Sequence, residues 1–216
     1  ALVKILKTAG VDFAILGDEE RCNCESARRL GNEYLYQIAT QEIIETLKQY
    51  KFNRILVACP HCYNTFKNEY PTFDAEYDVI HHTELIHELL KDGKLSVPSG
   101  SGSKVVFHDS CYLGRYNGIY DAPRNVLASV GCSLSSVERE KRHGFCCGAG
   151  GGQMWLEEQG DAINGIRTEE LLASGAEKIA AACPFCITML TDGVKEKESN
   201  VEVLDVAEII AAGLAS

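Results

Sequence analysis

The sequence predicts an α/β fold built from two tandem repeats that are related by an approximate twofold axis, each with a mainly parallel sheet flanked by helices. Two observations support this prediction. The second half of the chain repeats the first at a fixed offset of 124 residues, and repetition of this length indicates a duplicated domain. Within each copy, short apolar runs alternate with longer amphipathic stretches, and alternating strands and helices favour a parallel sheet.

The duplication is clearest around two Cys-Pro-x-Cys motifs. Residues 54–62 read RILVACPHC and align without a gap with residues 178–186, which read KIAAACPFC. Glu84 and Glu208 lie at the same offset of 124 residues farther along the chain. Near residue 1 the offset becomes about 121. The alignment therefore extends over nearly the whole chain.

We predict a first repeat over residues 1–95, a linker over residues 96–103 and a second repeat over residues 104–216. Serine and glycine alternate in the linker, a composition typical of a flexible connection or an exposed loop. Residue 1 already lies in a helical pattern, so the first repeat lacks the strand that opens the second. We therefore expect an N-terminally incomplete first repeat in a longer protein, where a counterpart of Cys111 would lie roughly ten residues before residue 1.

Each element of the second repeat is predicted from its periodicity. Short apolar runs predict buried strands, because helices cover both faces of a parallel sheet. Apolar residues three and four apart predict amphipathic helices. The predicted strands are 104–108, 132–137, 176–182 and 201–204, and the predicted helices are 116–130, 154–174, 184–190 and 206–214. The first repeat is expected to follow the same order without its opening strand.

Composition and charge exclude several classes of function. A formal net charge of −10 argues against a nucleic-acid partner or an anionic membrane, which would need a basic face. No apolar run approaches the roughly 20 residues that span a bilayer, and no signal-peptide pattern opens the chain. Ten cysteines in 216 residues of cytosolic character favour reduced thiols that serve a metal over disulfides. We therefore expect a cytoplasmic protein that is membrane-associated only through partners or upstream segments.

Five cysteines of the second repeat are candidate metal ligands: Cys111, Cys146, Cys147, Cys183 and Cys186. Thirty-four residues separate Cys111 from Cys146, and thirty-five separate Cys147 from Cys183. They lie where predicted strands end or helices begin, which is the usual ligand-binding edge of a parallel sheet and favours thiolates. Thiolates bind iron–sulfur clusters and zinc. A cubane cluster takes four, so the fifth would be spare, a redox thiol, or part of an unusual cluster.

A glycine run follows the adjacent cysteines. Residues 148–152 read GAGGG, and we expect Gly148 and Gly150 to let the backbone approach a bulky group and direct N–H groups at its sulfurs. The alternative is a flexible loop. The run lacks the spacing and the strand-turn-helix context of a dinucleotide site.

The first repeat departs from this pattern. At the positions of Cys146, Cys147 and Gly148 it has the sequence CNC, so asparagine replaces the second cysteine and cysteine replaces the glycine. The thiols that remain form a possible second site: Cys22, Cys24, Cys59 and Cys62. Four thiols are enough for tetrahedral zinc if Cys24 turns inward, and a second iron–sulfur cluster would need the upstream cysteine.

The spacing of Cys111, Cys146-Cys147, Cys183 and Cys186 resembles the cysteine-rich CCG domain of iron–sulfur oxidoreductases. This family includes B- and D-type heterodisulfide reductase subunits and related subunits of lactate-utilisation, glycerol-3-phosphate and quinone-linked enzymes. The resemblance implies a [4Fe-4S] cluster on those five cysteines, non-cubane in some members, and no separate catalytic residue. It implies an electron-transfer subunit that exchanges electrons with a ferredoxin-type, flavoprotein or quinone-linked partner, or with a disulfide-type substrate.

Two other functions stay open at this point. Cys59 and Cys62 alone form a thiol–disulfide exchange motif at a strand end, as in a thiol–disulfide oxidoreductase. Alternatively, zinc would only stabilise a structural module. Against both, the motif recurs at Cys183 and Cys186 with an adjacent cysteine pair at matching distance, which neither function needs.

Overall fold

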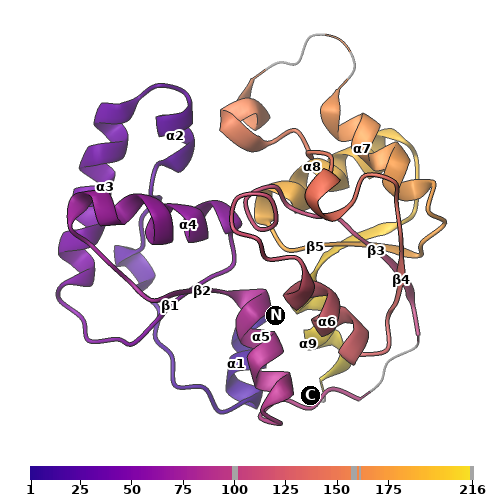
Figure 1. Cartoon of the computed structure of the whole chain (residues 1–216), viewed down its shortest axis with the longest axis horizontal. Helices are drawn as coiled ribbons and strands as arrows, with labels where there is room; N and C mark the ends of the chain where they lie inside the picture. The colour runs from indigo at the N-terminus through magenta and orange to yellow at the C-terminus, as the bar shows by residue number, and fades with distance from the viewer. Residues whose placement is uncertain (99–101, 157–159, 161, 215–216) are drawn as a thin grey trace.

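The computed structural model of the chain describes residues 1–98, 102–156, 160 and 162–214. Figure 1 shows two lobes side by side, the first repeat on the left and the second on the right, with helices of both between them at the bottom. The parallel sheets confirm the predicted α/β class. Of the predicted linker, residues 99–101 lie outside the described residues, and the repeat boundaries remain a prediction.

The second repeat has a four-stranded parallel sheet in the order β4-β3-β5-β6. The strands are β3 (Lys104–Phe107), β4 (Ser133–Ser135), β5 (Lys178–Ala181) and β6 (Glu202–Asp205). Side chains alternate between the two faces of the sheet. Val105 and Phe107 accordingly enter one core, and Val106 enters the other. This double burial explains why the central strands are almost wholly apolar.

Helices cover both faces of this sheet. They are α6 (Asp121–Ser129), α7 (Ile163–Leu172), α8 (Pro184–Glu196) and α9 (Val206–Gly213). Leu127 of α6 packs on the face of Val105, whereas Leu190 of α8 packs on the face of Val106. Both leucines are fully buried, and each such burial stabilises the fold by about 1.5–3 kcal/mol.

The first repeat contains a smaller sheet of two parallel strands, β1 (Ile55–Val57) and β2 (Val79–His81). Its helices are α1 (Leu2–Thr8), α2 (Glu25–Arg29), α3 (Glu33–Leu47), α4 (Pro60–Asn64) and α5 (His82–Lys91). A π-helical turn and a 3-10 turn follow α4. Ile43, Ile44 and Tyr70 form a separate core between α3 and these turns.

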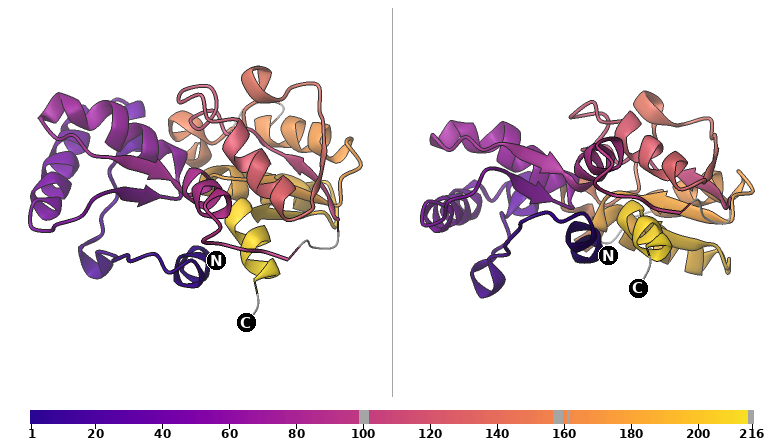
Figure 2. Two further views of the ribbon diagram at one scale, coloured as in Figure 1. Left: turned by 60° about the horizontal axis from the view of Figure 1, so that its bottom comes forward. Right: turned by 90° about the horizontal axis from the view of Figure 1, so that it is seen from below.

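The two repeats share their largest core. α1 packs on α9 and α5 packs on α6, and these contacts are equivalent, because α1 aligns with α6 and α5 aligns with α9. Ile5 and Ile86 of the first repeat lie in one cluster with Val126 and Ile210 of the second. Figure 2 shows the helices of both repeats meeting between the lobes. The halves are thus related by the approximate twofold axis that the duplication predicts.

One predicted helix of the second repeat begins later than expected. The helix predicted over residues 116–130 begins at Asp121. Gly118 has a φ of +72°, which interrupts a right-handed helix. Pro123 also fits only the first turn of a helix, because it has no backbone N–H to donate. Turns occupy the residues before Asp121 instead.

The long helix predicted over residues 154–174 is also wrong at its start. The α-helix α7 begins at Ile163. A 3-10 helix, η5 (Gly150–Trp155), precedes it, and its Gly151 and Gly152 have positive φ values that an α-helix cannot include. Residues 157–159 and 161 of the prediction lie outside the described residues.

A strand expected in the first repeat is missing from its described residues. Residues 11–16, which align with β4, are not in a strand. In the second repeat β4 pairs only with β3, and this chain holds no counterpart of β3 in its first repeat. Without a neighbouring strand to supply hydrogen-bond partners, an extended segment does not join a sheet.

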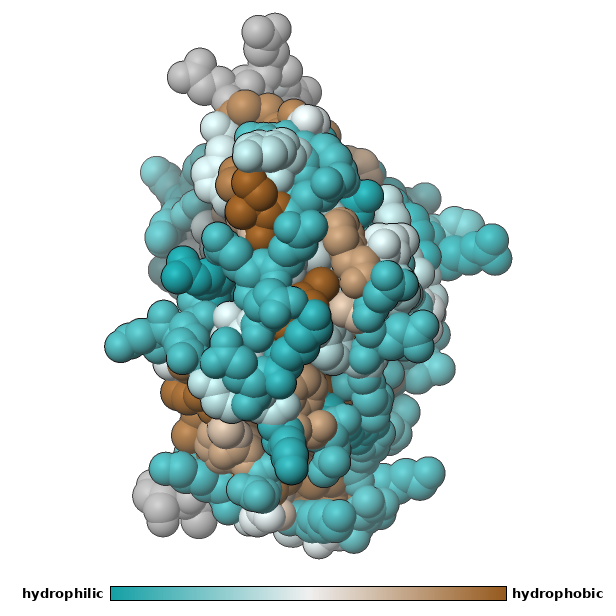
Figure 3. Space-filling model, turned by 90° about the vertical axis from the view of Figure 1, so that its left-hand side faces the viewer, coloured by the Kyte–Doolittle hydropathy of each residue, from teal (hydrophilic) through white to brown (hydrophobic). Residues whose placement is uncertain are grey.

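The outer face of the first repeat is mainly hydrophilic, with apolar side chains in small, separate patches (Figure 3). This agrees with the formal net charge of −10. No helix among the described residues is both long enough and apolar enough to cross a bilayer.

Candidate metal centre

Three segments bring cysteines to the carboxyl edge of the second sheet. Cys111 lies just beyond the end of β3, and Cys146 and Cys147 lie in the loop before η5. Cys183 follows β5 and is the N-cap residue of α8, with Cys186 in the first turn of that helix. Because β3 and β5 are neighbouring parallel strands, their ends deliver these segments to one place.

All five thiols join in a continuous series of side-chain contacts. Cys111 contacts Cys146, and Cys146 contacts Cys147. The Sγ atoms of Cys147 and Cys186 lie 3.3 Å apart, and Cys186 contacts Cys183. Each is a free thiol. Cys147, Cys183 and Cys186 are at most 3% exposed, so most of this group is closed to water.

Crowding changes the pKa values of these thiols. The hydrogen bond with Cys146, together with burial, raises the pKa of Cys111 well above its usual range. The hydrogen bond from Cys111 lowers the pKa of Cys146 to about 2, and contact with Cys146 raises the pKa of Cys147 to about 12. One thiolate is thus favoured, whereas neighbouring thiols resist ionisation until a cation compensates their charge.

Backbone N–H groups point at these sulfurs. The amide of Gly148 donates to Cys146 Sγ at 3.3 Å, and the amide of Cys186 donates to the Cys183 thiol. Gly148 has a φ of +94°, and a Cβ there would lie 3.2 Å from the Cβ of Ile163. The position therefore requires glycine, and its amide supports a negative charge on sulfur.

A cavity of about 450 Å³ opens beside Cys146. Its lining is mostly the loop that carries the cysteine: Arg115, Gly144, Phe145, Cys146, Gly148, Gly150, Gln153 and Ile163. Arg115 donates to the backbone carbonyl of Gly144, which holds a cation at the rim. The cavity gives a small molecule or a partner side chain access to one edge of the cysteine group.

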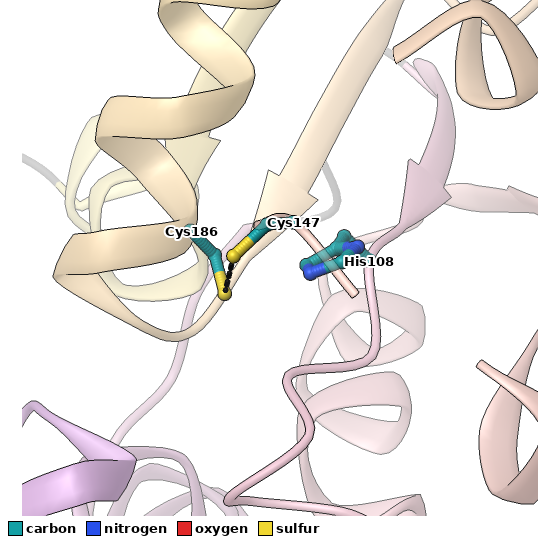
Figure 4. Close-up of side chains that lie close together, drawn as sticks. All are labelled: His108, Cys147 and Cys186. Atoms are coloured by element: carbon teal, nitrogen blue, oxygen red, sulfur yellow. Dashed lines mark hydrogen bonds between the residues drawn. The ribbon is translucent and has the colours of Figure 1, made fainter. Parts of the chain in front are cut away.

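A buried histidine lies beside the cysteines. Among the described residues, His108, Cys147 and Cys186 are the one group of three possible metal-binding side chains whose donor atoms lie within 4.8 Å of one another (Figure 4). Arg167 Nε donates to His108 Nδ1 at 3.1 Å. Sequence reasoning missed Arg167, although a charged residue four positions before the buried Leu171 on a helix was an available signal.

The thiols of the first repeat form a looser group. Cys59 is the N-cap residue of α4 and contacts Cys183, its own counterpart across the interface, as well as Cys62. The hydrogen bond with Cys183 lowers the pKa of Cys59 to about 2. Contact with Cys59 and burial raise the pKa of Cys62, with a smaller contribution from the charge of Cys22. Cys22 itself is exposed.

Despite its different side chains, the CNC segment keeps the backbone of the second repeat. The amide of Cys24 donates to Cys22 Sγ at 3.4 Å, which is the counterpart of the bond from Gly148 to Cys146. Cys24 has a φ of +54°, a left-handed conformation that costs a non-glycine residue roughly 1–2 kcal/mol. Its Sγ lies 3.7 Å from the carbonyl of Cys22, so the inward turn that a four-thiol site needs is not present.

Asn23 takes the place of Cys147. Its side chain faces Cys62 and lowers the pKa of that thiol, just as Cys147 contacts Cys186. The Asn23 side chain is buried, and its Nδ2 has no hydrogen-bond partner among the described residues. The first repeat thus keeps a donor aimed at this place but loses a thiolate.

A buried carboxylate that sequence reasoning also missed joins the two repeats beside these thiols. Glu25 is 3% exposed and accepts hydrogen bonds from Arg29 at 2.9 Å and from Tyr112 at 3.0 Å. Burial raises the pKa of Glu25, but His61, Arg29 and Tyr112 outweigh it and the net pKa is lowered. The ring of His61 stacks on Tyr112 at 4.1 Å and meets Phe185 edge-on at 4.9 Å. The variable residues of both Cys-Pro-x-Cys motifs therefore meet at the interface.

The donor set of the second repeat fits an iron–sulfur cluster. Such clusters are held by thiolates, and five uncrosslinked thiols meet there. Among the described residues, His108 Nε2 and Ser110 Oγ are buried beside Cys111 without a hydrogen-bond partner. A buried polar group left unpaired costs about 1–3 kcal/mol, so a group that brings its own sulfur acceptors would satisfy them.

Comparison with known proteins identifies the class of protein that this fold and site define. The sequence matches the CCG cysteine-rich domain family over residues 1–67 and 105–191. The chain therefore belongs to this family, as its cysteine spacing predicts.

Particular relatives cover nearly all of this chain. It is 49% identical over 220 residues to EtfAB:quinone oxidoreductase of Syntrophomonas wolfei, covering 97% of this chain and 31% of that protein. It is 47% identical over 215 residues to the probable iron-sulfur-binding oxidoreductase FadF of Bacillus subtilis, covering 98% and 30%. It is 30% identical over 222 residues to the D-type subunit of dihydromethanophenazine:CoB--CoM heterodisulfide reductase of Methanosarcina barkeri, covering 99% and 54%. The chain thus spans about a third to a half of the length of these relatives.

Proposed function

We propose that the second repeat binds one [4Fe-4S] cluster and that the chain is an electron-transfer domain of an iron–sulfur oxidoreductase. The proposed ligands are Cys111, Cys146, Cys147, Cys183 and Cys186. The observation that supports this most is the convergence of five free thiols from three segments on one largely buried place. A cubane uses four thiolates, so a contact series of five favours the five-cysteine, non-cubane form found in some family members.

When bound, an iron–sulfur cluster accepts and donates single electrons. The residues of the chain hold and tune it. The N-terminus of α8 directs N–H groups at Cys183, where the helix dipole favours negative charge. Burial of most of the sulfurs limits contact with water, which is one of the properties that set a reduction potential. The cavity beside Cys146 would give a redox partner or a small substrate access to the site.

For the first repeat we propose a second, weaker site on Cys22, Cys59 and Cys62. With Cys24 as a fourth thiol it would suit zinc, provided that the Cys24 side chain turns away from the Cys22 carbonyl. A second cluster would instead need a thiolate from a segment before residue 1. Contact between Cys59 and Cys183 means that the two sites would lie next to each other.

The proposed partners are other redox subunits or domains of ferredoxin, flavoprotein or quinone-linked type. Two of the relatives described above are named as a quinone oxidoreductase and an iron-sulfur-binding oxidoreductase. A disulfide-type substrate is the second candidate, supported by the name of the heterodisulfide reductase relative. We propose a cytoplasmic location, because ten free cysteines suit a reducing compartment. Another relative is named a probable membrane-anchored ferredoxin, so attachment to a membrane would come from other segments or partners.

Anaerobic purification followed by measurement of iron, acid-labile sulfide and zinc per chain tests the proposal. We expect about four iron and four sulfide per chain, with at most one additional zinc in the first repeat. Stoichiometric zinc without sulfide would instead favour a structural module. Metal-free protein that catalyses disulfide exchange through Cys59 and Cys62 would favour a thiol–disulfide oxidoreductase.

A further inference from the structure

His108 has one ring nitrogen engaged and the other without a partner. Nδ1 accepts a hydrogen bond from Arg167 Nε at 3.1 Å, whereas Nε2 is buried and has no hydrogen-bond partner among the described residues. One nitrogen of this ring lies within 4.8 Å of the sulfurs of both Cys147 and Cys186. In Figure 4 the end of the ring far from the backbone, which carries Nε2, is turned toward those sulfurs.

Arg167 determines which nitrogen of His108 carries the proton. A guanidinium has only donors and stays charged, so the nitrogen that it contacts must present a lone pair. Burial, together with the charge of Arg167, lowers the pKa of His108 to about 3, and the ring is therefore neutral. A neutral imidazole with its lone pair at Nδ1 has its single proton on Nε2.

The arginine is itself held in place. Arg167 is fully buried. Its Nη1 donates to Glu170 Oε2 at 2.6 Å and to the backbone carbonyl of Arg139 at 2.9 Å. Glu170 is in turn bound by the backbone amide of Arg139 at 2.9 Å. Because these contacts come from the helix and from the loop ahead of the cysteine pair, Arg167 cannot turn away from His108 without breaking several of them.

We propose that His108 donates its Nε2–H to the sulfur atoms of the metal centre, and that Arg167 is a positioning residue that imposes this donor role and prevents His108 from being a ligand. This inference rests on the proposed function. Ligation through Nε2 would remove the proton from that nitrogen while Arg167 still occupies Nδ1, which would leave the ring with no proton at all. A donor to cluster sulfur stabilises the more negative, reduced state and so raises the reduction potential.

The tautomer can be tested without any metal. Nitrogen-15 NMR of histidine-labelled, metal-free chain at about neutral pH should show His108 with its proton on Nε2. In Arg167→Met this preference should be lost, and in Arg167→Lys, which keeps a donor, it should be retained. A proton on Nδ1 in the unmodified chain would overturn the inference, and so would an unchanged tautomer in Arg167→Met.

The donor role is tested in the iron-loaded chain. His108→Leu should keep its iron and lower the reduction equilibrium constant roughly tenfold, which corresponds to about 59 mV for one electron. His108→Gln, which has an amide N–H, should recover most of this change. Arg167→Met should shift the potential in the same direction as His108→Leu. His143→Gln, at an exposed histidine, serves as the matched control and should not change the potential.

Two results would overturn the donor role. Loss of iron in both His108→Leu and His108→Gln, with strong coupling of a histidine nitrogen to the cluster in electron spin-echo spectra, would make His108 a ligand. An unchanged potential in His108→Leu would mean that no such hydrogen bond forms. If the unmodified chain binds no iron, the proposed function fails instead, and the NMR measurement still decides the tautomer.

Discussion

The two repeats have the same backbone but different chemistry at their Cys-Cys-Gly positions. In both, the amide of the third residue donates to the sulfur of the first, and the third residue has a positive φ. The second repeat places glycine there, as the conformation requires, whereas the first has Cys24. The middle residue is the buried Cys147 in one repeat and the buried Asn23 in the other. The duplicated backbone has therefore outlasted a change in the set of possible ligands.

The neighbouring position differs as well. Glu25 aligns with Ala149, and both are buried. In the first repeat this carboxylate binds Tyr112 of the second repeat and pairs with Arg29 and His61. In the second repeat the alanine is simply packed beside the cysteines. This segment thus serves the interface between the lobes in the first repeat and the thiol group in the second.

The largest expected effect separates the two thiol groups directly. Cys186→Ser and the aligned Cys62→Ser remove equivalent sulfurs. We expect Cys186→Ser to abolish iron binding, because a hydroxyl is a poor substitute for a thiolate ligand, and Cys62→Ser to retain most of the iron. Iron, sulfide and visible absorption per chain check this. Equal loss of iron in both variants would show that the repeats do not differ in the way described.

Replacing Glu25 by alanine gives the first repeat the residue that the second has. Removal of this carboxylate leaves His61 and Arg29 without their buried partner, and we expect the free energy of unfolding to fall by about 3–5 kcal/mol. Urea denaturation of the metal-free chain measures it. Glu45→Ala, which removes an exposed pair with Lys48, is the control and should cost at most about 1 kcal/mol. A similar small loss in Glu25→Ala would refute its role as the link between lobes.

Exchanging the third residue of each segment should change stability in opposite directions. Gly148→Ala introduces a Cβ into a left-handed conformation and 3.2 Å from the Cβ of Ile163, so we expect a loss of about 2 kcal/mol in the free energy of unfolding. Cys24→Gly removes the equivalent strain and should be neutral or stabilising by up to about 1 kcal/mol. The same denaturation experiment compares them. A stabilised Gly148→Ala would contradict the shared backbone geometry.

The smallest effect concerns pH and the interface near His81. Burial, with the charge of His82, lowers the pKa of the fully buried His81 well below its usual value. Below about pH 6.5 the unfolded chain therefore binds a proton that the folded chain does not, and stability falls as pH falls. His81→Asn keeps an acceptor for the amide of Thr83 but cannot titrate. It should reduce this slope by up to about 1.4 kcal/mol per pH unit. An unchanged slope between about pH 6 and 5 would mean that His81 is protonated in the folded chain.

The class of fold and the convergence of the five cysteines followed from local sequence patterns. Strand ends, the duplication and the Cys-Pro-x-Cys motifs are properties of short segments, so their meeting at one sheet edge was predictable. The start of α6 was not, because periodicity does not reveal the positive φ of Gly118. Arg167 and Glu25 were not predicted either. Their burial depends on partners 59 and 87 residues away, and charged residues on helices are usually solvated.

Anomalous diffraction from anaerobically grown crystals, recorded at the iron and zinc absorption edges, would locate each metal among the side chains. We predict an iron peak enclosed by the sulfurs of Cys111, Cys146, Cys147, Cys183 and Cys186. Zinc alone at that position, or iron bound elsewhere in the chain, would contradict the assignment of the cluster to the second repeat.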